Sequence, residues 1–350
     1  MIYLDNNATT QLLPSVQQKM IDFLKDNQSF NASAMHDFGR KGKYILEQAR
    51  SDILQIAAPN YKLIFVPSAT IANNIIIKNF KNIIVSSVEH SSVAKNQNIV
   101  INVDNNGYID IEHLTSLIKP INPPFLVSII HGHNETGVIN DIAKICDLVH
   151  SFGGLVHTDA VQSFGKIIAN LSELNADYYT IASHKIGGPI GAAALIYKKS
   201  FEPLIVGGGQ ESGMHGGTEN LLAIIGFAEA VKNMNVQNYQ AKILPLKNLL
   251  ETELENAGST IIAKNSLRLP NTIMISNTRM SNKSQLISAD MAGFAISIGS
   301  ACSSGTVKSS ATLRAMNIDD KIASCAIRIS LGLQNNINDI ERFIDFYKNN

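Results

Sequence analysis

The chain has 350 residues, 45% of them hydrophobic, enough for one large domain or for a large and a smaller domain with separate cores. Lysine plus arginine and aspartate plus glutamate both number 29, so no basic field is available to hold nucleic acid or an anionic membrane. No apolar run reaches the roughly 18 residues of a membrane span, and the first residues lack the apolar segment of a secretory signal.

From about residue 60 the sequence alternates short β-branched segments with helical patterns, which is typical of an α/β fold with a mostly parallel sheet wrapped by helices. The predicted strands are 62–66, 82–88, 98–103, 125–131, 154–160 and 177–182. In such a fold, ligands bind beyond the carboxyl ends of the strands. We therefore expect the site among the polar clusters that follow them, at 67–70, 89–92, 132–137, 159–162 and 183–189.

The pattern changes after about residue 235. It predicts a long helix near 238–257, a closing helix over 335–350, and strands near 271–277, 294–298 and 325–331. We therefore expect a large α/β domain over 11–235. Residues 1–10 together with 236–350 are expected to form a smaller α+β domain.

Two residues at strand ends have the chemistry of a pyridoxal phosphate site. Lys185 precedes glycines that permit close approach, which suits an amine that forms a Schiff base. Asp159 ends the preceding strand, so its carboxylate is expected in the same crevice. This cofactor needs a lysine on its aldehyde and an acid against its ring nitrogen. Taken singly, each residue has an ordinary alternative, a surface lysine and a helix N-cap.

Two further residues fit the same ligand. Thr70 opens the apolar segment 71–80, so its hydroxyl and the adjacent amides can hold phosphate oxygens or cap the helix. His90 is placed to lie over a flat ring or to move a proton, and the alternative is a hydrogen-bonded loop histidine.

The three cysteines differ in their surroundings. Cys302 lies in GSACSSGT, among small residues that leave a thiol reachable. Cys146 and Cys325 have apolar neighbours and are predicted to be structural. An odd number of widely spaced cysteines is neither a disulfide framework nor a zinc site, so we expect no metal and a reducing, cytoplasmic location.

Nine motifs, in order from the first residues to the last strand, resemble those of the cysteine desulfurases. These enzymes belong to the class V aminotransferase group of fold type I pyridoxal phosphate enzymes. The motifs are DNNATT (5–10), FNASAMHDFG (30–39), VEHSSV (88–93), HNETGV (133–138), HTDAVQS (157–163), SHKIGGP (183–189), GGGQESGMHGGTEN (207–220), GSACSS (299–304) and IRISLG (327–332).

The resemblance implies a role for each matching residue. It makes Lys185 the Schiff-base lysine, Asp159 the partner of the pyridine nitrogen, and Cys302 the sulfur acceptor. It makes Arg328 the receiver of the substrate carboxylate, a task that suits a planar two-pronged donor. The other implied contacts are Gln162 at the ring hydroxyl, His90 stacked on the ring, Asn134 near cofactor and substrate, Ala69, Thr70, Ser183 and His184 at the phosphate, and Thr218 from the second subunit of a homodimer.

These roles imply an enzyme that converts L-cysteine to L-alanine and leaves a persulfide on Cys302. The sulfur would then pass to an acceptor protein such as an iron-sulfur scaffold, or to tRNA thiolation. Four residues depart from the family pattern near the phosphate, with Ser183 a substitute for a missing serine: Ala182, Ile71, Ser212 and His215. Two alternatives stay open, namely a divergent paralogue that acts as a dimeric assembly partner and a related enzyme that uses selenocysteine or another amino acid.

Overall fold

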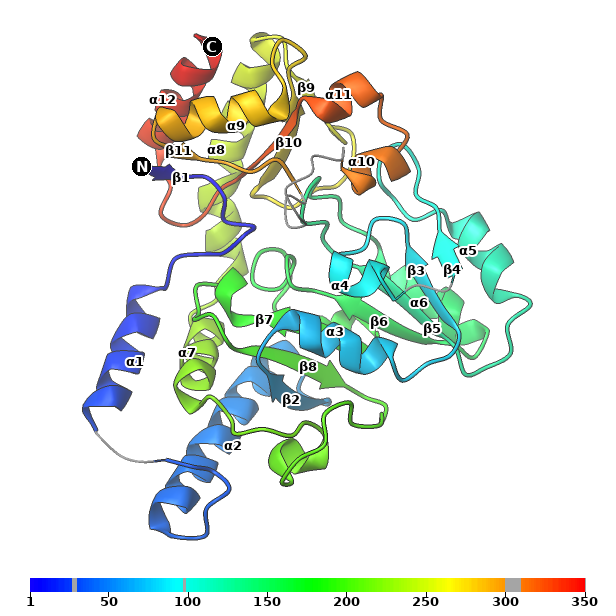
Figure 1. Cartoon of the computed structure of the whole chain (residues 1–350), viewed down its shortest axis with the longest axis vertical. Helices are drawn as coiled ribbons and strands as arrows, with labels where there is room; N and C mark the ends of the chain where they lie inside the picture. Colours follow the sequence, from blue (N-terminus) through cyan, green and yellow to red (C-terminus); the bar gives the residue numbers. More distant parts are fainter. Residues whose placement is uncertain (27–29, 97–98, 300–309, 350) are drawn as a thin grey trace.

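A computed structural model describes residues 1–26, 30–96, 99–299 and 310–349. Figure 1 shows a larger part built on one wide sheet and a smaller part around α8, α9 and α12. Among the described residues, no helix is long and apolar enough to cross a membrane.

The larger part contains a seven-stranded sheet in the order β2-β8-β7-β6-β5-β3-β4. Its strands are β2 (Lys62–Val66), β3 (Ile83–Ser86), β4 (Ile99–Ile101), β5 (Leu126–Ile130), β6 (Leu155–Asp159), β7 (Tyr178–Ala182) and β8 (Ala193–Tyr197). Neighbours from β7 to β4 are parallel, and β8 runs antiparallel to both β7 and β2. The predicted mostly parallel sheet is confirmed, and the sequence prediction did not include β8.

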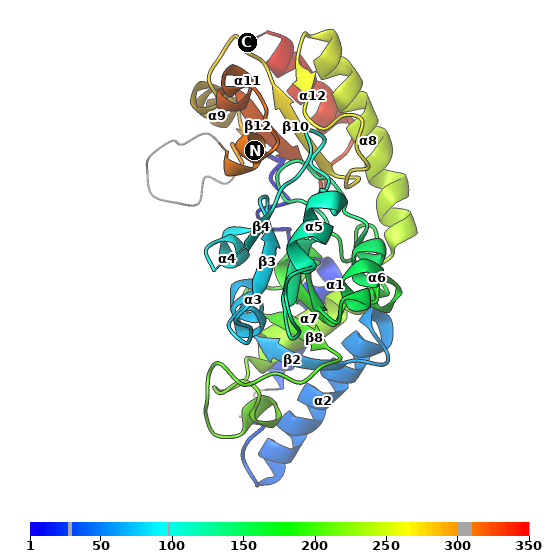
Figure 2. The same cartoon turned by 90° about the vertical axis from the view of Figure 1, so that its right-hand side faces the viewer.

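Helices cover both faces of this sheet, because its central strands are apolar on both sides. Every residue of β5 and β7 is buried. On one face pack α3 (Ala69–Ile77) and α4 (Ser91–Ala94). On the other face (Figure 2) pack α2 (Asp37–Ala57), α5 (Ile111–Ile118), α6 (Ile142–Ser151) and α7 (Leu221–Lys232). Shorter or outlying helices are α1 (Pro14–Lys25), η1 (Leu171–Leu174), η2 (Ser183–Lys185) and η3 (Gln210–Gly213).

The smaller part has its own apolar core between short sheets and helices. Its sheets are the antiparallel set β12 (Ala326–Ser330), β10 (Thr272–Ser276) and β9 (Thr260–Ile261), and the parallel pair β1 (Ile2–Tyr3) and β11 (Phe294–Ala295). Its helices are α8 (Val236–Asn256), α9 (Asn282–Met291), α10 (Ala311–Ala315), α11 (Asp320–Ser324) and α12 (Ile337–Lys348). The helices expected near 238–257 and at the end of the chain are confirmed.

The N-terminal strand belongs with the C-terminal residues, because Ile2 and Leu4 join the core of the smaller part. We propose that 11–235 forms one domain and that 1–10 with 236–350 forms the other. Leu313 and Met316 pack into the core of the larger part, so apolar contacts also join the two domains.

Truncation of Phe343 should destabilise the smaller domain. This side chain is fully buried in α12 and packs edge-on against Phe294, with ring centroids 5.3 Å apart. The Phe343→Ala change leaves a cavity and should cost about 3–5 kcal/mol of unfolding free energy. Urea unfolding followed by circular dichroism measures the loss. Ile337→Ala, at an exposed position of the same helix, is the control and should stay within about 0.5 kcal/mol of the parent. Equal losses in both variants would contradict the assigned core.

Candidate active site

The carboxyl ends of β6 and β7 bring several predicted residues together. Asp159 is the last residue of β6, and Lys185 follows β7 in the short helix η2. Gln162 lies in the turn after Asp159 and donates its Nε2 to the main-chain oxygen of Asn7 at 2.9 Å. Lys185 Nζ donates to the same oxygen and, at 2.8 Å, to the carbonyl of Ala8. Lys185 and Gln162 thus converge on one acceptor, as adjacent parallel strands predict.

Asp159 is buried and its two carboxylate oxygens have separate partners. Oδ1 accepts from the backbone N–H of Val161 at 3.0 Å, and Oδ2 accepts from Asn73 Nδ2 at 3.0 Å. The alternative of a helix N-cap is not observed, because a turn follows this residue. Asn73, which is fully buried on α3, fixes the direction of the carboxylate.

A hydrogen-bond chain continues from Asn73 to His90. Asn73 Nδ2 donates to Ser92 Oγ at 2.9 Å, and that hydroxyl is hydrogen-bonded to His90 Nδ1 at 2.8 Å. His90 is the N-cap of α4 and its ring is exposed. The histidine is therefore oriented by a backbone and a hydroxyl contact while its other ring edge faces outward.

The residues expected at a phosphate lie at the start of α3 and in η2. Ser68, rather than Thr70, is the N-cap of α3, so Ala69 and the exposed Thr70 sit in the first turn, where backbone N–H groups point outward. His184 Nδ1 is hydrogen-bonded to Thr9 Oγ1 at 3.2 Å. Burial, followed by the charge of Lys185, lowers the pKa of His184 to about 4, which keeps this ring neutral near pH 7.

Ser183 has a different environment. It is fully buried, and its hydroxyl has no hydrogen-bond partner within the described part of the chain. A β-carbon at Gly188 would lie 2.1 Å from that hydroxyl. Ser183 thus faces the backbone of the glycine-rich turn, and Gly188 has to be a glycine for the turn to close over it.

Arg328 lies beside the N-terminal segment on β12. Its Nη2 donates to Asp5 Oδ1 at 2.7 Å, and its Nη1 donates to the carbonyl of Asn134 at 2.9 Å. Asn134 O also accepts from Asn7 Nδ2 at 3.1 Å. The guanidinium is buried, yet its Nε has no partner among the described residues. Asp5 and the carbonyl of Asn134 thus fix the plane of the guanidinium.

Thr218 stands apart from these residues. It is exposed, and it lies on the loop that contains Glu211. The buried Glu211 carboxylate anchors this loop to β2 and α2. Glu211 accepts from Arg50 Nη1 at 2.7 Å and from the backbone N–H of Phe65 at 2.8 Å. Because β2 is an edge strand, Glu211 holds this loop at the edge of the sheet.

The four departures from the family pattern have unlike environments. Ala182 is buried at the end of β7, and Ile71 packs against the core beneath α3. Ser212 is exposed with a left-handed backbone, φ 57°. His215 is buried, and burial lowers its pKa, so it adds no fixed positive charge near pH 7.

Cys302 lies outside the described residues, but its flanking residues share one contact. Ser310 Oγ donates to Glu135 Oε2 at 2.7 Å, and a β-carbon at Gly299 would lie 2.7 Å from the same oxygen. Glu135 follows Asn134, whose carbonyl accepts from Arg328. The chain therefore enters and leaves the segment that contains Cys302 beside the Arg328 contact.

The other two cysteines are buried, as predicted. Cys146 lies in the core of the larger part and Cys325 precedes β12. Burial raises the pKa of the Cys146 thiol to about 12, which suppresses the reactive thiolate.

Several residues at the site carried no assigned role in the sequence analysis. They act through other side chains, so their own local pattern is weak. Asp5 and Asn7 lie in the DNNATT motif, Asn73 is a polar residue on the buried face of an apolar helix, and Lys166 is a lysine without exposure. The DNNATT motif and a polar residue on the buried face of an apolar helix are the two sequence features that indicate such positions.

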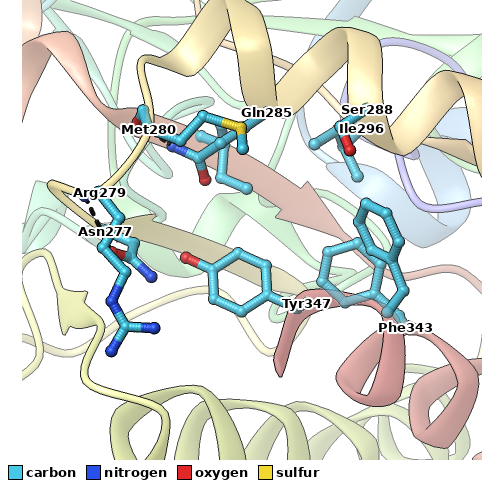
Figure 3. Close-up of a pocket in the computed structure, with 10 residues that line it drawn as sticks. Asn277, Arg279, Met280, Gln285, Ser288, Ile296, Phe343 and Tyr347 are labelled. Atoms are coloured by element: carbon cyan, nitrogen blue, oxygen red, sulfur yellow. Dashed lines mark hydrogen bonds between the residues drawn. The ribbon is translucent and has the colours of Figure 1, made fainter. Parts of the chain in front are cut away.

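A hollow in the smaller domain lies away from these residues, with an empty volume of about 400 Å³ that is partly open to solvent (Figure 3). It is lined by Asn277, Arg279, Met280, Gln285, Ser288, Ile296, Ile327, Phe343, Phe346 and Tyr347. None of the described residues predicted for the site belongs to this lining. Its mainly apolar lining belongs to the core of that domain.

Comparisons with known proteins agree with this arrangement of fold and site. Residues 2–343 match the family model described as aminotransferase class-V. A protein of Dictyoglomus turgidum named "Cysteine desulfurase IscS" is 33% identical over 98% of this chain and 93% of its own length. A cysteine desulfurase of Bradyrhizobium diazoefficiens is 34% identical over 75% of this chain and 71% of its own. The solved NifS-like protein of Rickettsia africae is 37% identical, with a TM-score of 0.92 over 100% of this chain and 99% of its own.

The chain belongs to the cysteine desulfurases of the class V aminotransferase family. The predicted family and fold class are confirmed. Enzymes of this family depend on pyridoxal phosphate.

Glu89, next to His90, should make the stability depend on pH. Its Oε1 accepts from Ser86 Oγ and from the backbone N–H of Ile130, both at 2.7 Å. Burial, with a smaller contribution from Asp159, raises its pKa from 4.5 to about 8. The unfolded chain loses this proton first as pH rises, so Glu89 lowers the unfolding free energy progressively between about pH 4.5 and 8.

Glu89→Gln keeps an acceptor oxygen but removes the titration. Relative to the parent, the unfolding free energy of the variant should rise by a few kcal/mol between pH 5 and pH 8, since each unit of pKa shift corresponds to about 1.4 kcal/mol. Urea unfolding at both pH values measures the difference. Glu112→Gln, at an exposed position of α5, is the control. A pH-independent difference between parent and Glu89→Gln would contradict a buried neutral carboxyl.

Proposed function

We propose that this chain is an active cysteine desulfurase that uses Lys185, Asp159, Arg328 and Cys302. The observation that carries the proposal is the convergence of Lys185 and Gln162 on the carbonyl of Asn7, at the strand edge where Asp159 is buried. The substrate is L-cysteine, and the products are L-alanine and a persulfide on Cys302.

The side chains gathered at this site have the functional groups that pyridoxal phosphate needs. The buried Asp159 supplies an acid for a protonated ring nitrogen, and Lys185 supplies a primary amine. Gln162 offers an amide and His90 an exposed ring, and the first turn of α3 offers outward N–H groups for a phosphate. When bound, the cofactor supplies an electron sink for the α-carbon of an amino acid.

The remaining chemistry belongs to side chains of the protein. Arg328 binds the substrate carboxylate through the N–H groups of Nη1 and Nη2 that Asn134 and Asp5 leave unused. Lys185 Nζ accepts the α-proton. The Cys302 thiolate attacks the substrate sulfur, so an S–S bond forms as the C–S bond breaks and alanine remains. The persulfide sulfur then passes to an acceptor protein such as an iron-sulfur scaffold.

The proposal predicts that Cys302→Ala abolishes alanine release from L-cysteine and retains the visible absorption of bound cofactor. Lys185→Ala should lose the turnover and also the covalent attachment of the cofactor, which borohydride reduction followed by mass spectrometry detects. Cys325→Ala, at a buried structural position, is the control and should keep its turnover. Normal alanine release by Cys302→Ala would remove the assigned nucleophile. A parent protein that stays colourless with added pyridoxal phosphate would favour the assembly role instead.

We also propose that the enzyme is a homodimer in which Thr218 completes the site of the partner. Thr218 is exposed and its loop is held at the β2 edge. Large apolar side chains are exposed on the same domain, which is typical of an interaction surface. They are Leu12, Ile21, Leu24, Met35, Phe38, Tyr44, Ile190, Leu204, Ile205 and Val206.

Mixed subunits test the shared site. A heterodimer of Lys185→Ala and Thr218→Val contains one site with both defects and one site with neither, because the intact residues combine across the interface. Co-expression with two affinity tags should therefore restore about half of the parent activity per dimer, more than either homodimer shows. Activity that never exceeds the average of the two homodimers would contradict a shared site.

The exposed apolar side chains give a second test, of the dimer itself. Val206→Asp should shift sedimentation toward the monomer, whereas Ile287→Asp, exposed on the other domain, should not.

A further inference from the structure

Lys166 is a buried lysine beside the proposed cofactor site, and the function above gives it no role. Only 2% of its surface is exposed. Its Nζ donates to Gln162 Oε1 at 2.7 Å and to Asn7 Oδ1 at 3.2 Å. Burying an amine is costly unless its hydrogen bonds are satisfied, so these two contacts require an explanation.

The first contact fixes the direction of the Gln162 amide. Lys166 Nζ donates to Gln162 Oε1, so the oxygen of the amide and not its nitrogen faces the amine. The amide nitrogen then donates to the carbonyl of Asn7 at 2.9 Å and keeps its second N–H for another acceptor. With Lys166 in place, Gln162 therefore offers a ligand a donor and not an acceptor.

The second contact fixes Asn7, the residue on which Lys185 converges. Asn7 Oδ1 accepts from Lys166 Nζ and, at 3.0 Å, from Asn271 Nδ2. The carbonyl of the same residue accepts from Lys185 Nζ. One buried amine thus restrains both the amide that faces the ligand and the carbonyl that holds the reactive amine.

We propose that Lys166 is a positioning residue that keeps the Gln162 N–H directed at an anionic ring oxygen and the Asn7 carbonyl directed at Lys185. The inference rests on the proposed function, because the anionic oxygen is the ring phenolate of pyridoxal phosphate.

The charges around Lys166 agree with this role. Lys185 and Arg328 are the cations that act on it, and Asp5 is the carboxylate paired with that arginine. Burial, then these two cations, lowers the pKa of Lys166 well below its ordinary value of 10.5. Gln162 and Asn7 supply two acceptors for the N–H groups of this buried amine.

The variant Lys166→Met fills the same space without a donor, so the Gln162 amide is free to rotate. The dissociation constant for pyridoxal phosphate should rise on the order of 10-fold, since one net hydrogen bond is at stake. A donor to a phenolate favours the anion, so its loss should raise the pH midpoint of the visible absorption change of the bound cofactor. Adding Lys166→Met to Gln162→Met should move the pH midpoint little further, because Lys166 acts on the ring oxygen through Gln162.

A matched control is Lys247→Met, because Lys247 is a buried lysine far along the chain whose Nζ donates to the carbonyl of Leu269 at 2.9 Å. It should lower stability without moving the cofactor affinity or the pH midpoint. Lys166→Leu, which also lacks a donor, serves in place of Lys166→Met if the latter does not fold.

The outcomes separate this inference from the proposed function. Failure of the parent protein to bind pyridoxal phosphate at Lys185 would overturn the proposed function. Parent-like affinity and pH midpoint in Lys166→Met, or in Lys166→Leu, would overturn the role of Lys166 alone. Changes of equal size in Lys247→Met would show a general effect of stability and would also overturn it.

Discussion

The site depends on the polar contacts of Asn7, which tie the start of the chain to both domains. Its carbonyl accepts from Lys185 and Gln162 of the larger domain, while its Nδ2 donates to Thr272 Oγ1 at 2.8 Å in the smaller one. Its N–H donates to Ser330 Oγ at 2.9 Å. Each of these buried groups needs a partner, so the position of the N-terminal segment is strongly determined. Lys185 and Arg328, which we propose as the reactive lysine and the substrate arginine, can therefore be held in one geometry although they come from different parts of the fold.

The alternation of β-branched segments with helical patterns was enough to predict the large sheet, because parallel strands buried on both faces are continuous apolar runs. Strand β8 escaped that prediction, since its AALIY sequence is short, alanine-rich and preceded by glycines. The predicted strands 82–88 and 98–103 end later than the observed β3 and β4, because the apolar pattern continues to the buried Val88 and Val103. Tertiary pairing, which a local pattern does not contain, decides where such strands end.

The candidate site divides along a similar line. Lys185 and Asp159 were found because they follow strands and have chemistry of their own, whereas Gln162 was assigned through the family resemblance. Asn73 and Lys166 were not found, because each acts by fixing the direction of another polar side chain, which depends on contacts between residues distant in sequence. Asp159 accepts a hydrogen bond from Asn73, which lies 86 residues away in the sequence. No periodicity or spacing predicts such a pair. The DNNATT motif signalled that the N-terminus matters without showing which of its atoms are used.

The electrostatics of the site explain why a ligand with negative charge fits it. Lys185 and Arg328 lower the pKa of the buried Lys166, and Asp5 is paired with Arg328. Gathering amines and a guanidinium in one region costs free energy when they are charged. Under the proposed function, a carboxylate at Arg328 and an anionic cofactor near Lys185 would relieve this cost. The protein thus accepts lower stability without ligands in exchange for donors that are already directed at their acceptors.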